Sequence, residues 1–223
     1  PRGKGALLMW GLTINGKHTG ADWGLGCASC TLTAPEPRTY SIDIPGADGV
    51  LDTTAARGRV TYRNRTLTAV FERVYASRAA FDAACAALNT AHHGRTVTVT
   101  LDSDAAHTLS GRAKWQHDAD GFAGTHTLTV DCAPYRMAAA ETAQTFEVSG
   151  ELAITLQNAQ KAVIPVFDTE AEGMAVKLPT GAQYTILQTG GCTIPEVCLQ
   201  EGANPMTLIG TGSVAIRYRE GVL

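Results

Sequence analysis

Hydrophobic and polar positions alternate with a period of two over most of this chain, which is the pattern typical of β-strands. The clearest case is residues 96–101, where valine and leucine alternate with threonine. Similar alternation predicts strands around residues 67–71, 109–115 and 125–130. The sequence Asp-Ala-Asp-Gly at residues 118–121 is rich in turn formers, so we predict that the last two of these strands pair as a hairpin.

One segment has helical periodicity instead. Residues 77–93 begin with Ser77, a good N-cap, and continue through an alanine-rich run. The larger apolar side chains of this run recur at spacings of three and four, which places them on one helical face. Gly94 follows and can end the helix. The sequence therefore predicts a mainly β protein with one α-helix.

The patterning changes partway along the chain, and this predicts two domains. Residues 9–135, which start at the first methionine, are assigned to an N-terminal mixed β-domain. Residues 136–147 are alanine-rich and weakly patterned, so they are expected to form a connector. Residues 148–223 contain short apolar stretches separated by Gly and Pro, which is typical of a β-sandwich. Residues 1–8 are interpreted as a leader or expression remnant and are left out of the fold assignment.

A turn-rich stretch at residues 40–54 joins two alternating segments. Residues 40–44 alternate apolar and polar side chains, which predicts a half-buried strand. Pro-Gly at residues 45–46 and the pair Asp48 and Gly49 are strong turn signals, because Pro presets φ and Gly accepts positive φ. We therefore expect a strand, a turn and a second strand in this stretch.

Composition sets only broad limits on function. Of the 223 residues 44% are hydrophobic and 17% charged, which is enough to build a packed core. The net charge of −3 does not indicate a general nucleic-acid binder, and the longest apolar run is too short for a membrane span. Arginine is concentrated in the first domain, at Arg57, Arg59, Arg63 and Arg65. These arginines either form a solvated strand face or meet an acidic neighbour.

The candidate chemical motifs do not indicate catalysis. Cys27 and Cys30 form a Cys-x-x-Cys pair, but strand and turn residues follow it, so no helix lowers the pKa of either thiol. A zinc site made by this pair with His92 and His93 remains an alternative, and Cys85 is assigned to core packing. No nucleophile elbow, phosphate loop or dinucleotide fingerprint is present. We therefore expect free thiols, no cofactor, no bound metal and no enzymatic activity.

Several motifs together resemble one known family. Residues 45–54 resemble the PG-x-DG-x-LD-x-T segment of the distal tail proteins of long-tailed, non-contractile phages. The Gly-Arg pair at residues 111–112 and the D-x-x-PY sequence at residues 131–135 follow in the order found in that family. Asn158 and Pro165 match part of an N-x-G-x-x-x-x-P element further on. The order and spacing of these motifs, rather than any one of them, carry the resemblance from Met9 onward.

This resemblance implies a virion structural protein. In that family the first domain assembles into a hexameric ring, and the second is a galectin-like β-sandwich that projects outward. The ring joins the tail tube to the tail tip or baseplate, and DNA passes through its centre. The implied partners are five further copies of the chain, the tail tube protein, the tape measure protein and the receptor-binding or lysin proteins of the tip, with no membrane. The implied location is the tail tip of the virion, after assembly in the host cytoplasm.

The residues expected to make contacts between proteins are Arg57, Arg59, Arg63, Arg65, Asp48 and Gly49.

A carbohydrate-binding β-sandwich module for adhesion to a host surface is the alternative function. Sugar recognition commonly uses exposed aromatic faces. Residues 149–223 contain no tryptophan, and their aromatic side chains are Phe167, Tyr184 and Tyr218. Aromatic side chains on strands usually belong to the core, so we expect little stacking surface in the second domain.

Overall fold

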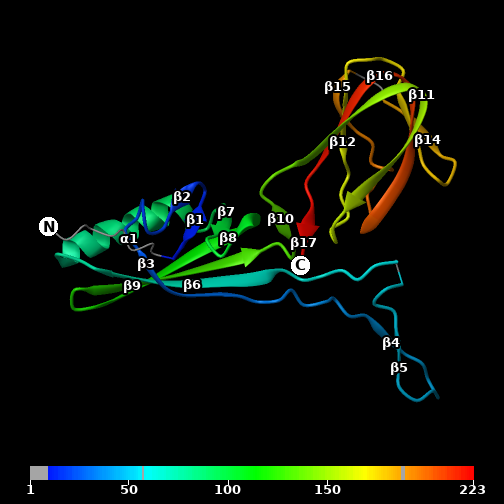
Figure 1. The fold of residues 1–223 in the computed structure, drawn as a ribbon. Helices are drawn as coiled ribbons and strands as arrows, with labels where there is room; N and C mark the ends of the chain where they lie inside the picture. The colour runs from blue at the N-terminus through cyan, green and yellow to red at the C-terminus, as the bar shows by residue number, and fades with distance from the viewer. Residues whose placement is uncertain (1–9, 57, 187–188) are drawn as a thin grey trace. The chain divides into compact units, whose positions relative to one another are not determined.

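The structure is a computed structural model that describes residues 10–56, 58–186 and 189–223. It divides into two compact units, Pro1–Arg136 and Met137–Leu223 (Figure 1). Strands dominate both units, and a single helix is present among the described residues. This confirms the mainly β class predicted from the sequence. The helix, α1 (Arg78–His92), is too short to cross a membrane.

The first unit is built on one antiparallel sheet. Its strands are β1 (Leu12–Ile14), β2 (Lys17–His18), β3 (Gly26–Leu32), β6 (Arg65–Val74), β7 (Thr96–Leu101), β8 (Asp104–Asp120) and β9 (Ala123–Cys132). They lie in the order β2–β1–β7–β8–β9–β6–β3. The predicted hairpin is confirmed, because β8 and β9 pair from Gly111 opposite Cys132 to Asp120 opposite Ala123. Gly121 turns between them with a φ of 59°.

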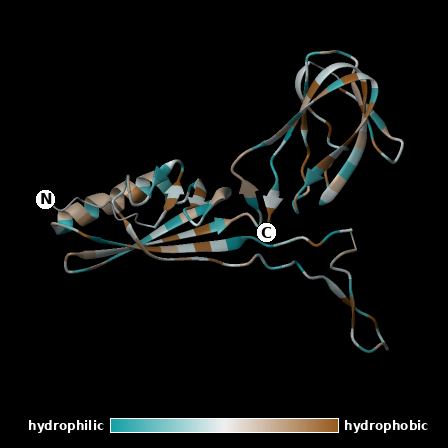
Figure 2. Ribbon diagram, viewed as in Figure 1, coloured by the Kyte–Doolittle hydropathy of each residue, from teal (hydrophilic) through white to brown (hydrophobic). Residues whose placement is uncertain are grey.

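The core of this unit lies between the sheet and α1, which packs against β8. Figure 2 shows hydrophobic and hydrophilic positions alternating along the strands. Leu67, Ala69 and Phe71 on β6 are completely buried, as their alternation predicts. The predicted helix is also confirmed: the Ser77 hydroxyl accepts a hydrogen bond from the Ala80 amide at 3.2 Å.

After β3 the backbone runs out from the sheet and returns to β6, which forms a long extension. We call this extension, residues 33–64, the arm. Beyond the β3–β6 pair, the Arg63 amide donates to the Glu36 carbonyl and the Arg38 amide donates to the Thr61 carbonyl, each at 2.8 Å. The arm ends in a separate hairpin of β4 (Ser41–Asp43) and β5 (Val50–Asp52) (Figure 1).

The predicted strand–turn–strand unit is therefore present at the end of the arm. The prediction of a half-buried strand is wrong, because all residues from 40 to 52 are exposed within the chain. The physical reason is that β4 pairs with β5 as a sheet of its own, and none of the described strands joins it.

The second unit contains two long strands and several short ones. Its strands are β10 (Arg136–Ala138), which crosses the boundary between the units, β11 (Thr142–Asn158), β12 (Val166–Thr169), β13 (Ala175–Lys177), β14 (Gln183–Thr185), β15 (Gly190–Thr193), β16 (Gly202–Tyr218) and β17 (Gly221–Val222). β11 and β16, each of 17 residues, pair along their whole length. The expectation of short strands alone is therefore wrong.

The predicted connector at 136–147 also differs from the structure, because β10 and the start of β11 occupy it. The partly buried face at the start of β11 carries Thr142, Gln144 and Phe146. Only Phe146 is hydrophobic, so the sequence shows no clear alternation of apolar and polar residues there.

Glycines divide the β11–β16 ribbon into two halves. Gly150 lies opposite Gly210, and Gly210 and Gly212 have φ values of 131° and 138°, which favour glycine. Before this point β16 pairs with β13, and after it β16 pairs with β12. The β11–β16 ribbon therefore belongs both to the part of the sheet that contains β13 and to the part that contains β12, and the hydrophobic core of the second unit packs against this sheet. That core includes Leu156, Phe167, Val176, Leu208 and Ile216.

Candidate functional site

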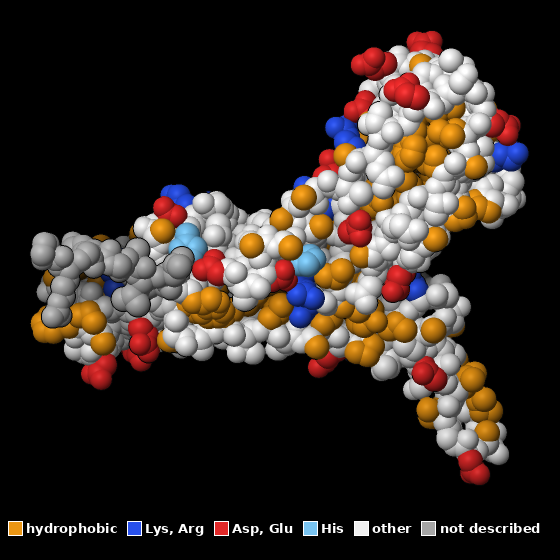
Figure 3. All heavy atoms as spheres, in the orientation of Figure 1, with side chains coloured by type: hydrophobic (Ala, Val, Ile, Leu, Met, Phe, Trp, Pro, Cys, Tyr) orange, Lys and Arg blue, Asp and Glu red, His pale blue; other side chains and the backbone are white. Residues whose placement is uncertain are grey.

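The arm exposes large apolar side chains that would normally lie in a core. The exposed fraction is 54% for Ile42, 61% for Val50 and 50% for Leu51, and Tyr40 and Ile44 are similarly exposed. Figure 3 shows these hydrophobic side chains gathered along the end of the arm. Contiguous exposed apolar surface of this kind marks a protein interaction site. The end of the arm is therefore the main candidate contact surface of the first unit.

Hydrogen bonds hold the base of this hairpin in shape. The Thr53 amide donates to the Tyr40 carbonyl at 2.8 Å, and the Tyr40 amide donates to the Thr54 hydroxyl at 3.0 Å. The Asp52 carboxylate accepts from the Thr54 amide at 2.8 Å, and hydrogen bonding to Thr54 lowers the pKa of Asp52. The apolar side chains at the end of the arm are thus presented by an ordered scaffold.

The structure does not bring the predicted interaction residues together as one patch. Asp48 and Gly49 lie exposed at the tip of the arm, and Gly49 has a φ of 78° as its turn requires. Arg59 and Arg63 are exposed on the arm. Arg57 lies outside the described residues.

The prediction that Arg65 lies on a contact surface is wrong, because its side chain is buried within the first unit. Its side chain is only 7% exposed and donates to the carbonyl oxygens of Thr33, at 2.9 Å, and Pro134, at 3.4 Å. Burial lowers the pKa of Arg65. The signal was available in the sequence, because Arg65 shares the period-two face of the buried Leu67 and Ala69.

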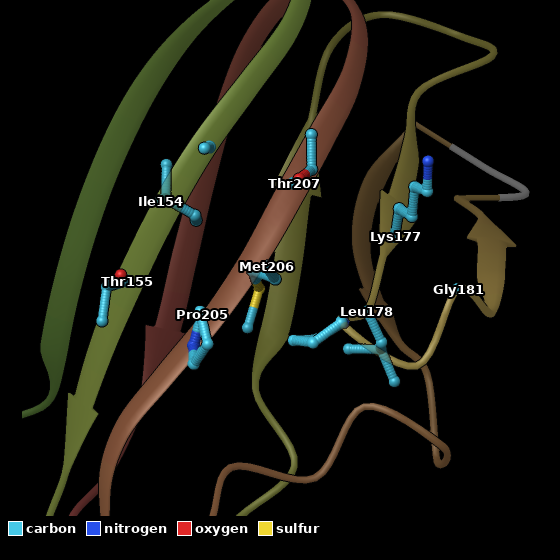
Figure 4. A pocket seen from close by; sticks show the side chains of 10 residues that line it. Ile154, Thr155, Lys177, Leu178, Gly181, Pro205, Met206 and Thr207 are labelled. Atoms are coloured by element: carbon cyan, nitrogen blue, oxygen red, sulfur yellow. The ribbon is translucent and has the colours of Figure 1, made fainter.

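The second unit carries a shallow pocket of about 390 Å³, which is a candidate ligand site (Figure 4). Figure 4 shows Ile154, Met206 and Leu178 along it, with Lys177 as its charged residue. None of the described residues that line it is aromatic. Phe167 and Tyr218 are 0% and 3% exposed, and Tyr184 packs against the core. Of these three aromatic side chains, Tyr184 is the one left partly exposed, which gives little surface for stacking on a sugar.

The cysteines described by the structure are all free, as predicted. Burial raises the pKa of the Cys27 thiol to about 11 and also raises that of Cys30. Both lie on β3 rather than at a helix N-terminus, so neither is an activated thiol. Cys85 differs from its predicted place in the core, because it is only partly buried and lies beside two histidines.

Those histidines belong to a cluster formed between α1 and the β8–β9 hairpin. His117 on β8 lies directly opposite His126 on β9, and their Nδ1 atoms are 2.8 Å apart. The Nε2 atom of His117 is 3.2 Å from the Asn89 amide oxygen, and the Nε2 atom of His126 is 2.7 Å from the Tyr75 hydroxyl. We call these four residues and Cys85 the histidine cluster.

Burial and neighbouring positive charges keep the histidines of this cluster neutral. Trp115 stacks on His117, and Phe81 stacks on His126, which is completely buried. Burial, with the neighbouring His117, lowers the pKa of His126 to about 4. Burial and then His93 lower the pKa of His117 as well. Both imidazoles are therefore neutral at pH 7.

Sequence reasoning missed this cluster although its hairpin was predicted. The turn at 118–121 places the two histidines near each other across the hairpin, but the prediction of the hairpin did not include which residues pair. In the described part of the chain, Cys85, His117 and His126 form the one group of three or more His, Cys, Asp or Glu side chains placed to hold a metal ion.

Comparisons with known proteins address the fold. No protein-family model matches the sequence, and no curated protein matches it. Among solved structures, the chain is similar to the crystal structure of SPP1 Dit (gp 19.1), described as a paradigm of the hub adsorption apparatus in phages that infect Gram-positive bacteria. The TM-score is 0.71 with 14% identity, over 96% of this chain and 99% of that one. The resemblance to distal tail proteins is thus confirmed for the fold, through both units of the chain.

Proposed function

We propose that this chain is a distal tail protein, a structural hub of a phage tail rather than an enzyme. Two independent likenesses support the proposal. One is the fold, which matches a hub protein over 96% of this chain. The other is the order of short motifs along the sequence, from the Pro-Gly turn at the end of the arm to the D-x-x-PY sequence. In this proposal the hub joins the tail tube to the tail tip.

The apolar side chains exposed at the end of the arm are the main support for self-assembly in this proposal. We assign its occupant as a neighbouring copy of this chain. An arm that leaves one subunit and docks on the next gives a head-to-tail contact, which closes into a ring when the rotation is right. Because these side chains are about half exposed, completing the burial of each contributes roughly 0.8–1.5 kcal/mol, so several of them together support a stable contact.

The proposed ring is a hexamer that surrounds a channel for DNA. Its further partners are the tail tube protein, the tape measure protein and the receptor-binding or lysin proteins of the tip. The proposed location is the tail tip of the virion, after assembly in the host cytoplasm.

Light scattering coupled to size-exclusion chromatography tests this proposal. We expect a particle of six times the chain mass of 23.4 kDa and ring-shaped images by negative-stain microscopy. A species that stays monomeric at high concentration and low salt contradicts the proposal. A dimer contradicts the ring geometry.

We further propose that the first unit alone forms the ring. The arm and the β3–β6 pair from which it extends both belong to this unit, and the compact units divide between Arg136 and Met137. A fragment of residues 9–141 ends just before β11 and should fold and assemble into rings in negative-stain images. A folded but monomeric fragment would show that the second unit is required for assembly.

A further inference from the structure

We propose that Cys85, His117 and His126 bind one zinc ion, which joins α1 to the β8–β9 hairpin. The thiol comes from the middle of α1, and the imidazoles come from facing positions on the two strands. Their ligand atoms all lie within 4.8 Å of one another. Neither the fold likeness nor the assembly proposal requires this site, so the inference stands independently of the proposed function.

The spacing is close to that of a zinc site. Zinc binds imidazole nitrogen at about 2.0–2.1 Å and thiolate sulfur at about 2.3 Å, so ligand atoms around a tetrahedral ion lie roughly 3.3–3.7 Å apart. The two Nδ1 atoms, now 2.8 Å apart, would have to separate by about half an ångström to reach that geometry. The Cys85 sulfur, within 4.8 Å of a nitrogen of each ring, would have to approach by as much as about 1 Å, so binding requires rotations of all three side chains.

The outer partners of both histidines suit metal binding. A metal-bound histidine usually donates its other ring N–H to an acceptor that fixes its orientation. The Asn89 amide oxygen accepts from Nε2–H of His117, which leaves the Nδ1 lone pair of that ring available. Without metal, this lone pair accepts from Nδ1–H of His126, and the Tyr75 hydroxyl donates to Nε2 of His126.

Zinc binding would rearrange these protons in a balanced way. The His126 proton moves from Nδ1 to Nε2, where the Tyr75 oxygen can accept a hydrogen bond from it. The Cys85 thiol releases one proton to solvent as its sulfur binds the metal. His117 keeps its proton on Nε2. One proton therefore leaves the protein for each zinc ion bound.

The chemistry of the ligand set favours zinc over harder cations. A thiolate with two imidazoles is a soft and borderline donor set, unlike the oxygen ligands that magnesium and calcium require. Three protein ligands leave a fourth position for water. Phe81 and Trp115 stack on the outer faces of the two imidazoles and reduce access of bulk water.

Metal titration of the full chain tests the inference. The protein is purified without chelator, stripped with EDTA and titrated with Zn²⁺ and, separately, with Co²⁺ as a spectroscopic probe. We expect one ion per chain by elemental analysis, a thiolate-to-cobalt charge-transfer band, and an unfolding temperature that Zn²⁺ raises by several degrees. Absence of the charge-transfer band and of any thermal shift in the folded protein overturns the inference, and the cluster is then a metal-free hydrogen-bonded contact.

Three variants locate the site. Cys85→Ala removes one ligand at a partly exposed helical position where alanine suits the helix, so the chain should remain folded. We expect loss of the charge-transfer band and a decrease in zinc affinity of at least about 100-fold. Asn89→Ala should weaken binding about 10- to 100-fold without changing the stoichiometry. Cys30→Ala, on β3, should bind as the parent does. Zinc affinity in Cys85→Ala equal to that of the parent overturns the inference.

Discussion

Replacing Ile42 and Leu51 together by aspartate should convert the proposed ring into monomers without unfolding the chain. These residues are cross-strand partners on β4 and β5, so their side chains lie side by side on one face. They are 54% and 50% exposed, so the substitutions remove little packing within the chain. In the proposed ring, by contrast, they would place two carboxylates in each apolar contact between subunits. Burying an unpaired charge costs several kcal/mol, which is enough to abolish assembly at micromolar concentration.

Light scattering measures the mass of this double variant, and circular dichroism checks that it keeps the folded β-sheet spectrum of the parent. Ile164→Asp is the matched control, because Ile164 is 46% exposed but belongs to the second unit. The control should assemble normally. A double variant that still forms rings would show that the arm does not carry the subunit contact.

Gly111→Ala is expected to destabilise the first unit strongly. A Cβ atom at this position would lie 2.2 Å from the Asp131 carbonyl oxygen and 2.7 Å from the Cys132 Cα atom. Both are backbone atoms of the neighbouring strand β9, so no side-chain rotation relieves the overlap. The β8–β9 pairing would have to open locally, at a cost on the order of 3–5 kcal/mol.

Chemical denaturation followed by tryptophan fluorescence measures this effect selectively, because Trp10, Trp23 and Trp115 all belong to the first unit. Ser110→Ala changes the exposed neighbouring residue and should shift the free energy of unfolding by no more than about 0.5 kcal/mol. An unchanged midpoint for Gly111→Ala would mean that the strands around Gly111 are not packed as described.

Local patterns predicted the elements whose signals are local. The α1 helix and the β8–β9 hairpin each combine a clear period with a cap or a turn, so the sequence alone was enough to place them. The β11–β16 ribbon was missed for two physical reasons. Its first residues only partly bury Thr142 and Gln144, which are polar, and glycines such as Gly210 separate its apolar stretches although β16 continues through them.

The candidate sites depended on facts that alternation does not contain. Alternation in the arm indicates a strand correctly, but it cannot distinguish a face covered by the same chain from a face left for another molecule. The histidine cluster needed the exact register of a hairpin and the position of α1 above it. For Arg65, by contrast, the sequence did contain the needed signal, because Arg65 is two residues from Leu67 and so lies on the same buried face of β6. It was grouped instead with the nearby exposed arginines.

The way the arm joins the sheet has a mechanical consequence. The arm begins where β3 and β6 leave the sheet, and β6 pairs with β9 over its full length, from Arg65 opposite Cys132 to Val74 opposite Ala123. A pull that reaches the sheet along the axis of β6 loads all of these backbone hydrogen bonds at once in shear. Bonds loaded in shear must fail together, whereas bonds that are peeled fail one after another. In the proposed ring, a subunit held by its arm would bear tension of this direction without the sheet unzipping from one end.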